Sequence, residues 1–400
     1  MIILIAAFAA KFGISDNFVA RSIASRDAVD AERAIRFDSL NASAHQALAG
    51  ILRANGQFEA AAIEYERSIE LRRFDYRTRL DLGSIQKEIG NAALAERSFR
   101  DAVRLAPHYS RPNFVFGSVL VERGQYDDGF AHLRVAARGD DSLYPQLIES
   151  AARIASGDPD RIISFVGTAE LVGRIKLAEY FVVNSILTEP VMALLTGDGL
   201  PNYEKEAIAR RLLDNGKPAV ARAVWLTTID GRFAVDDGSV YDGGFEDDQI
   251  NDRGLFGWDV TKMNGSVNVK FDANGAFQGN RSLFIRYSGH IAPDTDVISQ
   301  RLLVTPRAKY RLSYVYNSTE MVSAALPQFV LRSGNGTELV RSAPLNGTRG
   351  QWVRGSVDFD SLETAFVIVG LRREHCDNNP CPVFGDLRLD AIELKKAGPR

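Results

Sequence analysis

The sequence lacks the residues and patterns that mark metal clusters, membrane spans and the common enzyme classes. Its 400 residues include two cysteines and five histidines, too few and too scattered for a metal cluster. The apolar stretch Met1–Ala10 is shorter than the roughly 20 residues that a bilayer-spanning helix needs. There is no G-x-S-x-G motif, Walker loop or glycine-rich dinucleotide motif, and no recognisable pair of glycosidase carboxylates. We therefore expect a protein that is not an enzyme.

An excess of positive charge is also missing. Lys and Arg together number 48 and Asp and Glu 51, for a formal net charge of −3. Proteins that bind nucleic acid neutralise phosphates with an excess of basic residues, so no nucleic-acid partner is expected. With 45% apolar and 25% charged residues, the composition is that of a folded soluble protein, which excludes disordered and polytopic membrane classes.

Both ends of the chain bear on its location. Residues 1–15 begin with the apolar stretch, which is either the tail of a signal or single membrane anchor that starts upstream, or a first helix packed against the next. Near the other end, Cys376 and Cys381 flank an Asn-Asn-Pro turn that favours a disulfide, with two free thiols or half of a metal site as alternatives. Disulfides persist in oxidising compartments, so the pair indicates the periplasm or cell envelope, where an inner-membrane anchor would fit the apolar start.

A repeat of 34 residues runs through the first part of the chain. Each unit predicts two helices joined at a glycine, with a small residue where the helices approach and a large one between neighbouring units. Three sets of residues keep the spacing: Gly56, Gly90 and Gly124; Ala61 and Ala95; Tyr65, Phe99 and Leu133.

These residues at this spacing resemble the tetratricopeptide repeat, over units 42–75, 76–109 and 110–143. The third unit departs from the family at Gly129, where alanine is preferred. The resemblance implies an α-solenoid over residues 16–143, with a concave groove that binds a protein partner; a solvated face on a spacer is the alternative. The groove positions in this chain are Gln46, Gly50, Arg53, Leu80, Ser84, Lys87, Phe114, Ser118 and Glu122.

Residues 144–229 remain helical in pattern while the repeat decays. Residues 212–225 again resemble the turn of a repeat, with Gly216, Ala221 and Trp225 in register. This stretch predicts degenerate helical hairpins that extend the solenoid.

The pattern changes from helical to alternating near residue 230. A polar segment rich in Gly and Asp, residues 230–242, predicts a linker. Residues 243–396 then predict an all-β jelly-roll sandwich, so the fold class is multidomain α + β. The expected strands are 282–287, 299–304, 310–316, 327–333, 338–343, 351–359, 365–373 and 387–394.

The order of landmarks in this second half resembles carbohydrate-binding modules of the galactose-binding-like fold. The landmarks are GGFE (243–246), LFGWDV (255–260), FQGNRSLFIRY (277–287) and CPVFGDLRLDAIEL (381–394). Many members of that fold hold a structural calcium ion through the Glu of the opening motif and an Asp of the last strand. The resemblance therefore implies calcium at Glu246 and Asp390, although Ala391 stands where a second polar residue is common.

A sugar site needs aromatic rings for stacking and polar groups that fix the hydroxyls. Strand alternation places such residues on shared faces, with core packing as the alternative for the aromatics and a solvated face for the arginines. The candidates for glycan binding are Trp258, Tyr314, Tyr316, Gln328, Arg332 and Arg372.

Together these patterns predict a non-enzymatic envelope protein that joins a protein-binding helical scaffold to a glycan-binding module, in polysaccharide assembly or export. The alternative is a pure protein–protein interaction scaffold whose sandwich binds no sugar. An exposed aromatic groove on a sheet would favour the first function, and a flat face of Arg, Ser and Thr the second.

Overall fold

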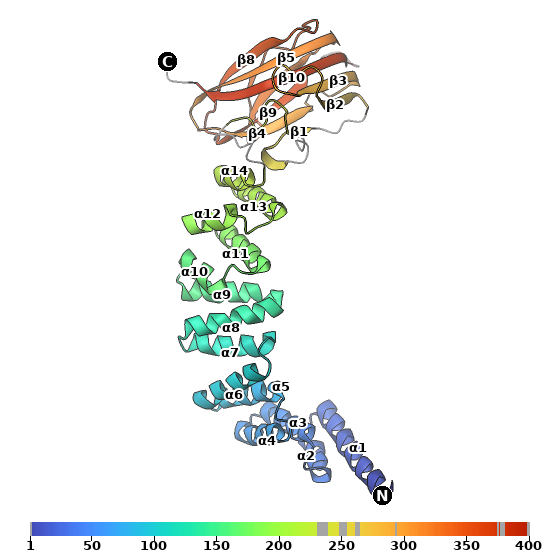
Figure 1. Ribbon diagram of the computed structural model, residues 1–400, viewed down its shortest axis with the longest axis vertical. Helices are drawn as coiled ribbons and strands as arrows, with labels where there is room; N and C mark the ends of the chain where they lie inside the picture. The colour runs from blue at the N-terminus through green and yellow to red at the C-terminus, as the bar shows by residue number, and fades with distance from the viewer. Residues whose placement is uncertain are drawn as a thin grey trace. The chain divides into compact units, whose positions relative to one another are not determined.

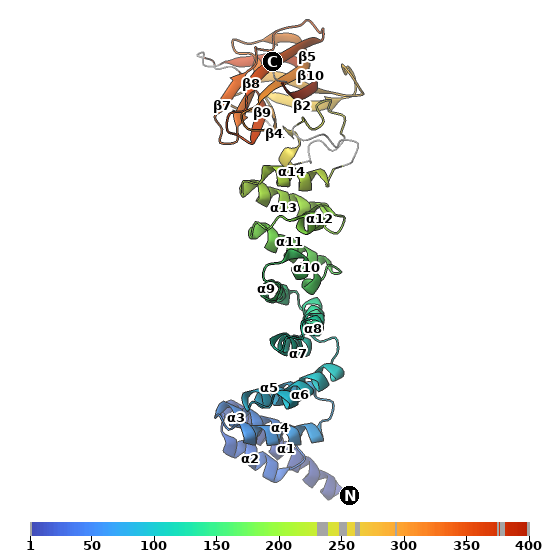
Figure 2. The same ribbon diagram turned by 90° about the vertical axis from the view of Figure 1, so that its left-hand side faces the viewer.

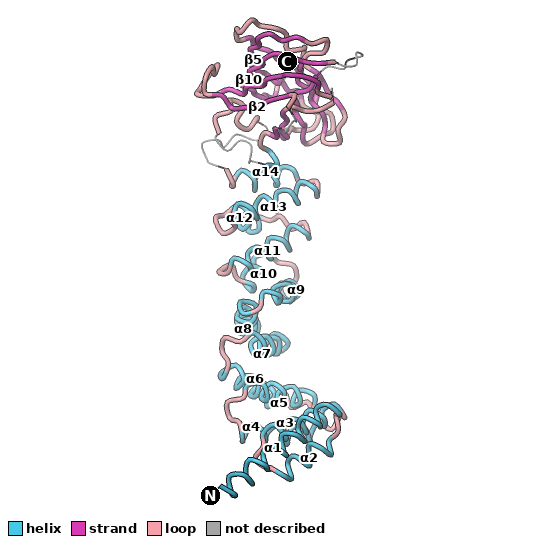
Figure 3. The backbone as a smooth tube through the Cα atoms, turned by 90° about the vertical axis from the view of Figure 1, so that its right-hand side faces the viewer, coloured by secondary structure: helices cyan, strands magenta, loops and turns pink. Residues whose placement is uncertain are grey.

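The computed structural model describes residues 2–229, 239–247, 254–260, 265–292, 294–373, 376 and 381–397. The chain forms two compact units, Met1–Phe181 and Val182–Arg400. Helices come first along the chain and two antiparallel sheets follow, which confirms the predicted α + β class (Figure 3). The division falls inside the helical stretch, so the last three helices belong to the same unit as the strands.

The first unit is a series of helical hairpins (Figures 1 and 2). The predicted units 42–75, 76–109 and 110–143 correspond to the pairs α3–α4, α5–α6 and α7–α8. None of the helices that the structure describes combines the length and apolar character needed to cross a bilayer. The bounds are α1 (Ile2–Ser25), α2 (Ala28–Phe37), α3 (Ala42–Ala54), α4 (Phe58–Leu71), α5 (Tyr76–Glu88), α6 (Ala92–Leu105), α7 (Ser110–Glu122), α8 (Tyr126–Gly139), α9 (Tyr144–Ile154), α10 (Pro159–Val166) and α11 (Leu171–Val183).

Glycine recurs in each hairpin because the turn needs a left-handed backbone. The φ angles of Gly56, Gly90 and Gly124 are 74°, 88° and 78°, values that a residue with a Cβ rarely adopts. Gly83 has a different role, because a Cβ there would overlap the ring of Phe99. The missing side chain lets α5 and α6 pack closely.

Phe99 fills the space between neighbouring hairpins. Its side chain is 1% exposed and belongs to a cluster with Leu80 of α5 and Phe116 of α7. A hairpin of this kind cannot bury its own apolar face, so this contact holds successive units together.

We expect Phe99→Ala to destabilise the first unit by about 3 to 5 kcal/mol, because it removes a buried ring and leaves a cavity. Circular dichroism at 222 nm during urea unfolding measures the loss. The chain's three tryptophans, at 225, 258 and 352, all lie in the second unit, so their fluorescence transition should not move.

Phe74→Ala is the matched control, because Phe74 is 86% exposed in the α4–α5 connection. It should change stability by no more than about 0.5 kcal/mol. Equal losses in the two variants would contradict the packing role of Phe99.

The second unit begins with α12 (Glu189–Thr196), α13 (Asn202–Asp214) and α14 (Pro218–Leu226). The turn between α13 and α14 follows the predicted repeat register: Gly216 has a φ of 70°, and Ala221 and Trp225 are fully buried. A short 3-10 helix, η4 (Gly254–Phe256), also contacts both α13 and α14.

The strands form two five-stranded sheets that pack face to face around one core. Sheet I has the order β1-β4-β9-β6-β7 and sheet II the order β2-β3-β10-β5-β8, and all recorded pairs are antiparallel. Eight strands match expected ones, and β1 and β2 are additional. The bounds are β1 (Asp259–Val260), β2 (Val267–Asp272), β3 (Ser282–His290), β4 (Ile298–Leu303), β5 (Lys309–Val322), β6 (Pro327–Ser333), β7 (Glu338–Arg341), β8 (Val353–Asp360), β9 (Phe366–Arg373) and β10 (Pro382–Lys396).

Residues 239–242 are part of the sandwich, which corrects the predicted linker at these positions. Tyr241 is fully buried, and the amide of Gln300 binds both its N–H (3.1 Å) and its C=O (2.9 Å). The rest of the predicted linker, residues 230–238, lies outside the described residues.

The disulfide between Cys376 and Cys381 is present, as predicted. Beside it, the buried guanidinium of Arg373 donates to the carbonyl oxygens of Cys381 (2.7 Å) and Ile291 (2.8 Å), and its Nη2 lies 2.9 Å from Cys381 Sγ. The disulfide and Arg373 thus hold the start of β10 against the end of β9.

Reducing the disulfide should destabilise the second unit by about 2 kcal/mol, the chain-entropy value for so short a loop. Urea unfolding followed by tryptophan fluorescence, with and without dithiothreitol, measures the change. The double variant Cys376→Ser, Cys381→Ser should unfold like the reduced protein and ignore reductant. Superimposable curves for oxidised and reduced wild type would contradict the expectation.

Candidate functional site

A cleft of about 470 Å³ opens on the outer face of sheet I, within the second unit. Trp258, beside β1, forms part of its wall, and α13 contributes one residue from outside the sandwich. Its charged and hydroxyl side chains are Arg210, Asp259, Asp296, Ser299, Arg301 and Arg332. This is a polar hollow with half of its lining residues on strands.

Strand alternation aims these side chains outward. On β4, Ser299 and Arg301 alternate with buried Ile298 and Leu302. On β6 and β9, the register pairs Arg332 with Ile368, Val330 with Gly370, and Gln328 with Arg372, and all six point away from the core.

Asp296 organises the arginines at one side of the cleft. Its carboxylate accepts hydrogen bonds from Arg332 Nη2 and Arg372 Nε, and lies 3.3 Å from Arg372 Nη2. The three side chains are only 16–18% exposed. Gly370 makes this possible, since a Cβ there would overlap Asp296 Oδ1. One acid therefore fixes two arginines on neighbouring strands.

Three of the predicted glycan-binding residues meet here. Trp258 and Arg332 line the cleft, and Arg372 joins through Asp296. Trp258 is 2% exposed and its Nε1 donates to the Asp242 carbonyl at 3.1 Å. The indole is thus part of the wall and presents no ring face for stacking.

The other three predicted residues are placed differently. Tyr314 and Tyr316 lie in the core on sheet II, where the Tyr314 ring is 4.6 Å from that of Phe329. Burial raises the pKa of both phenols. These tyrosines follow the core alternative, because the shared face of their strand points inward. Gln328 is on the same outer face as Arg372 but is only 3% exposed.

Arg210, Asp296 and Arg301 were not predicted from the sequence. Alternation along the expected strand 299–304 does carry a signal for Arg301, because it places Ser299 and Arg301 on one face. Arg210 comes from a helix about 90 residues before β4, and Asp296 from the loop before that strand. No local pattern connects them to the cleft.

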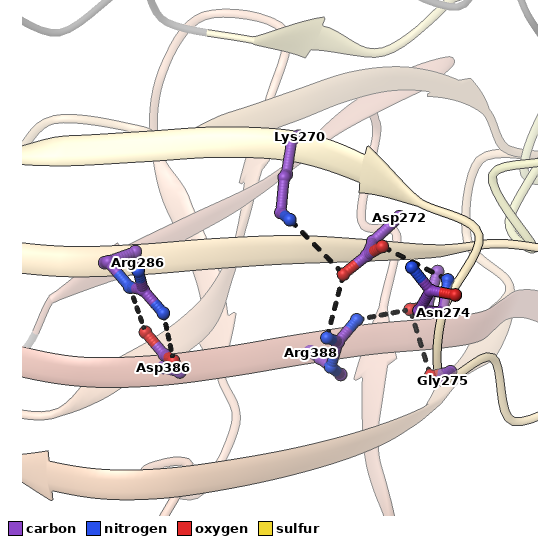
Figure 4. Close-up of polar contacts among 8 residues, drawn as sticks. Lys270, Asp272, Asn274, Gly275, Arg286, Asp386 and Arg388 are labelled. Carbon is purple, nitrogen blue, oxygen red and sulfur yellow. Dashed lines mark hydrogen bonds and ion pairs between the residues drawn. The ribbon is translucent and has the colours of Figure 1, made fainter.

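The outer face of sheet II offers a contrast, because its charges pair with one another (Figure 4). Asp272 Oδ2 lies 2.9 Å from Arg388 Nη2 and 3.5 Å from Lys270 Nζ, and Arg286 binds Asp386 with two hydrogen bonds of 2.8 and 2.9 Å. Hydrogen bonds from the Asn274 N–H and from Arg388 lower the pKa of Asp272, and Arg286 lowers that of Asp386. These ions satisfy each other on a sheet surface.

The two predicted calcium ligands bind backbone N–H groups instead. Asp390 Oδ2 accepts from Phe277 (2.7 Å) and Gln278 (3.2 Å), and Glu246 Oε1 accepts from Asn280 (2.7 Å) and Arg281 (3.1 Å). Asp390 Oδ1 accepts from Ala391 at 2.7 Å. N–H donors repel a cation, so this arrangement does not fit calcium.

Asp390 is buried, and its burial raises the pKa of its carboxyl group. Within the described parts of the chain, no group of three or more His, Cys, Asp or Glu residues is arranged to hold a metal ion.

We expect the melting temperature of the second unit to be the same, within about 1 °C, in millimolar calcium and in EGTA, because a ligand stabilises only a site that it occupies. Tryptophan fluorescence reports the transition. A rise in calcium that is absent in Asp390→Asn would contradict this and support the calcium site.

The groove positions of the helical repeats are distributed over α3, α5 and α7. Leu80 is 2% exposed and packs between units, which corrects its assignment to the groove. Lys87 on α5 pairs with Glu122 on α7 at 2.5 Å. Arg53 on α3 lies 3.9 Å from Asp81 on α5. Charges thus bridge successive first helices along this face.

The remaining groove positions form none of these ion pairs between helices. Ser84 donates its hydroxyl to the Leu80 carbonyl at 2.9 Å. Gln46, Gly50, Phe114 and Ser118 are partly exposed. The face therefore offers both apolar and polar side chains to solvent.

Comparison with known families agrees with this arrangement of hairpins. A family model described as tetratricopeptide repeat matches residues 42–75 and 76–109. Residues 42–109 are tetratricopeptide repeats. The α7–α8 hairpin follows directly along the chain, beyond the residues matched. No curated protein matches the chain.

Solved structures resemble each half separately. The CBM22-1 xylan-binding domain of Xyn10C from Paenibacillus barcinonensis is 19% identical, covers 42% of this chain and all of that chain, and has a TM-score of 0.29. YrrB, a tetratricopeptide protein with an unusual peptide-binding site, is 14% identical over 41% of this chain and 88% of its own, with a TM-score of 0.32. PilF of Pseudomonas aeruginosa is 15% identical, covers 55% of this chain and 90% of its own, and has a TM-score of 0.34. Such scores are too low for any property of these proteins to be transferred.

Proposed function

We propose that the protein is a non-enzymatic adaptor of the cell envelope. Its tetratricopeptide region binds a protein partner, and the cleft on sheet I binds a glycan. A place in polysaccharide assembly or export fits this pairing of modules. The disulfide supports an oxidising compartment such as the periplasm.

The cleft is the observation that carries the glycan half of the proposal. Its volume of about 470 Å³ is in the range of small-ligand sites, roughly 300–1,000 Å³. Asp296 and Gly370 hold its arginines in place before any ligand arrives, which lowers the entropic cost of binding. The outer face of sheet I is therefore hollowed rather than flat, although it is not the exposed aromatic groove that was expected of a sugar site.

Recognition in this cleft depends on hydrogen bonds rather than stacking. The described lining presents no exposed aromatic ring, since Trp258 is buried. Arginine, aspartate and serine side chains can donate to and accept from sugar hydroxyls.

The same geometry supports a binding role over a catalytic one. A glycosidase needs two carboxylates that act as acid and base or nucleophile. Of the two acids in the described lining, Asp296 accepts hydrogen bonds from two arginines. Asp259 alone cannot supply both roles.

A blocked cleft tests the proposal. The full chain is screened against neutral and acidic polysaccharides by affinity electrophoresis, and Ser299→Phe places a ring in the cleft that Ser299 lines. We expect retention on at least one polysaccharide, weakened at least about tenfold by Ser299→Phe, because the added ring occupies the ligand volume.

Ser356→Phe is the matched control, because Ser356 is exposed on β8 of sheet II. It should bind like wild type. A folded chain that is retained on no polysaccharide would reject the glycan half and leave the pure protein-interaction scaffold. Equal losses in both variants would place binding outside the cleft.

A further inference from the structure

The charges of the cleft are unequal. Three arginines, Arg210, Arg301 and Arg332, face two aspartates, Asp259 and Asp296. Arg372 stands directly behind Asp296 and adds a further positive charge. The described lining of the hollow therefore carries an excess of positive charge, although the whole chain has a formal net charge of −3.

The ion pairs account for only part of this charge. Asp296 is shared between Arg332 and Arg372. Arg301 donates to the carbonyl of Leu255 at 3.2 Å, and neither it nor Arg210 forms an ion pair with any residue that the structure describes. Among the residues that the structure describes, these two guanidinium groups line the cleft without an ion-pair partner.

One buried donor at the cleft lacks a hydrogen-bond acceptor. The Nε of Arg332 is buried and has no hydrogen-bond partner in the structure. A buried donor without an acceptor costs free energy, and such groups concentrate where a ligand or a water completes the network. On sheet II, by contrast, the arginines of Figure 4 have acids as partners.

The planar guanidinium group matches a carboxylate in shape and charge. Two parallel N–H donors can bind both carboxylate oxygens, and such charged hydrogen bonds are about twice as strong as neutral ones. A neutral sugar would leave Arg210 and Arg301 without an anionic partner, whereas an acidic sugar would supply one. Asp259 and Ser299 remain available for hydroxyl groups.

We propose that the glycan bound in this cleft carries carboxylates, as a uronic acid polymer does, and that Arg210 and Arg301 bind them. This proposal rests on the proposed function and specifies its ligand class. Arg332 and Arg372 are positioning residues. Both donate hydrogen bonds to Asp296, whose carboxylate lies against Gly370.

The test compares carboxylated polymers with their own neutral forms. Polygalacturonate, alginate and hyaluronate are titrated into the full chain by isothermal calorimetry, each beside its carboxyl-reduced derivative. We expect at least one of the three to bind, and its reduced form to bind about 10- to 100-fold more weakly, from the loss of charged hydrogen bonds.

Two variants on one helix separate the cleft from general surface charge. Arg210→Glu should weaken binding of the carboxylated polymer by at least tenfold. Arg211→Glu makes the same change on the next residue of α13, which is exposed and outside the cleft, and should stay within about twofold of wild type. Both arginines are on the surface, so both variants should fold, which circular dichroism and tryptophan fluorescence check.

Each remaining outcome overturns the proposal in a distinct way. Equal binding of carboxylated and reduced polymers would reject the acidic ligand while retaining the proposed function. Equal losses in Arg210→Glu and Arg211→Glu would indicate nonspecific attraction. Dextran sulfate bound as tightly as the uronates would indicate a general polyanion surface. No binding of any polysaccharide, with poly-glutamate bound in an Arg210-dependent way, would reject both proposals and assign the cleft to an acidic protein.

Discussion

Much of the second unit depends on side chains that satisfy buried backbone groups where no regular element can do so. Gln300 binds both the N–H and the C=O of Tyr241, and Asp242 accepts from Glu246 N (2.7 Å) and Asp247 N (2.9 Å). Beside the disulfide, Arg373 donates hydrogen bonds to the carbonyl oxygens of Ala325, Ile291 and Cys381. An unpaired buried backbone group costs as much as a lost hydrogen bond, so these contacts decide how the connecting segments lie on the sandwich.

The same constraint explains the behaviour of the two acids that the family resemblance assigned to calcium. Glu246 and Asp390 each accept from two consecutive N–H groups of the 277–281 segment. They hold this segment against the sandwich through hydrogen bonds. Both acids of the motif therefore have a structural role in fixing this segment.

The two outer faces of the sandwich differ because of one small residue and one distant helix. Gly370 leaves space for Asp296 on sheet I, and Asp296 draws Arg332 and Arg372 together. Arg210 of α13 then contributes to the wall of a hollow that the strands alone do not enclose. On sheet II, acids and bases on neighbouring strands pair across the surface and leave a satisfied face. Lys270, Arg286 and Arg388 also form cation–π contacts with Phe284, at 4.7–5.3 Å from the centre of its ring. These contacts further occupy the basic side chains of this face.

Local chemistry made much of the fold predictable from the sequence. Positive φ at Gly56, Gly90 and Gly124 depends on neighbours within one repeat, and packing at Phe99 depends on its own repeat and the next, so a period of 34 reveals both. Alternation likewise revealed eight strands and the outward position of Arg332 and Arg372. Only the tertiary structure decided which face of a strand turns to the core, as for Tyr314 and Tyr316, and which loops bring Asp296 and Arg210 to the cleft. Periodicity records that two faces of an element differ, whereas burial and ion pairing depend on what the rest of the chain places against each face.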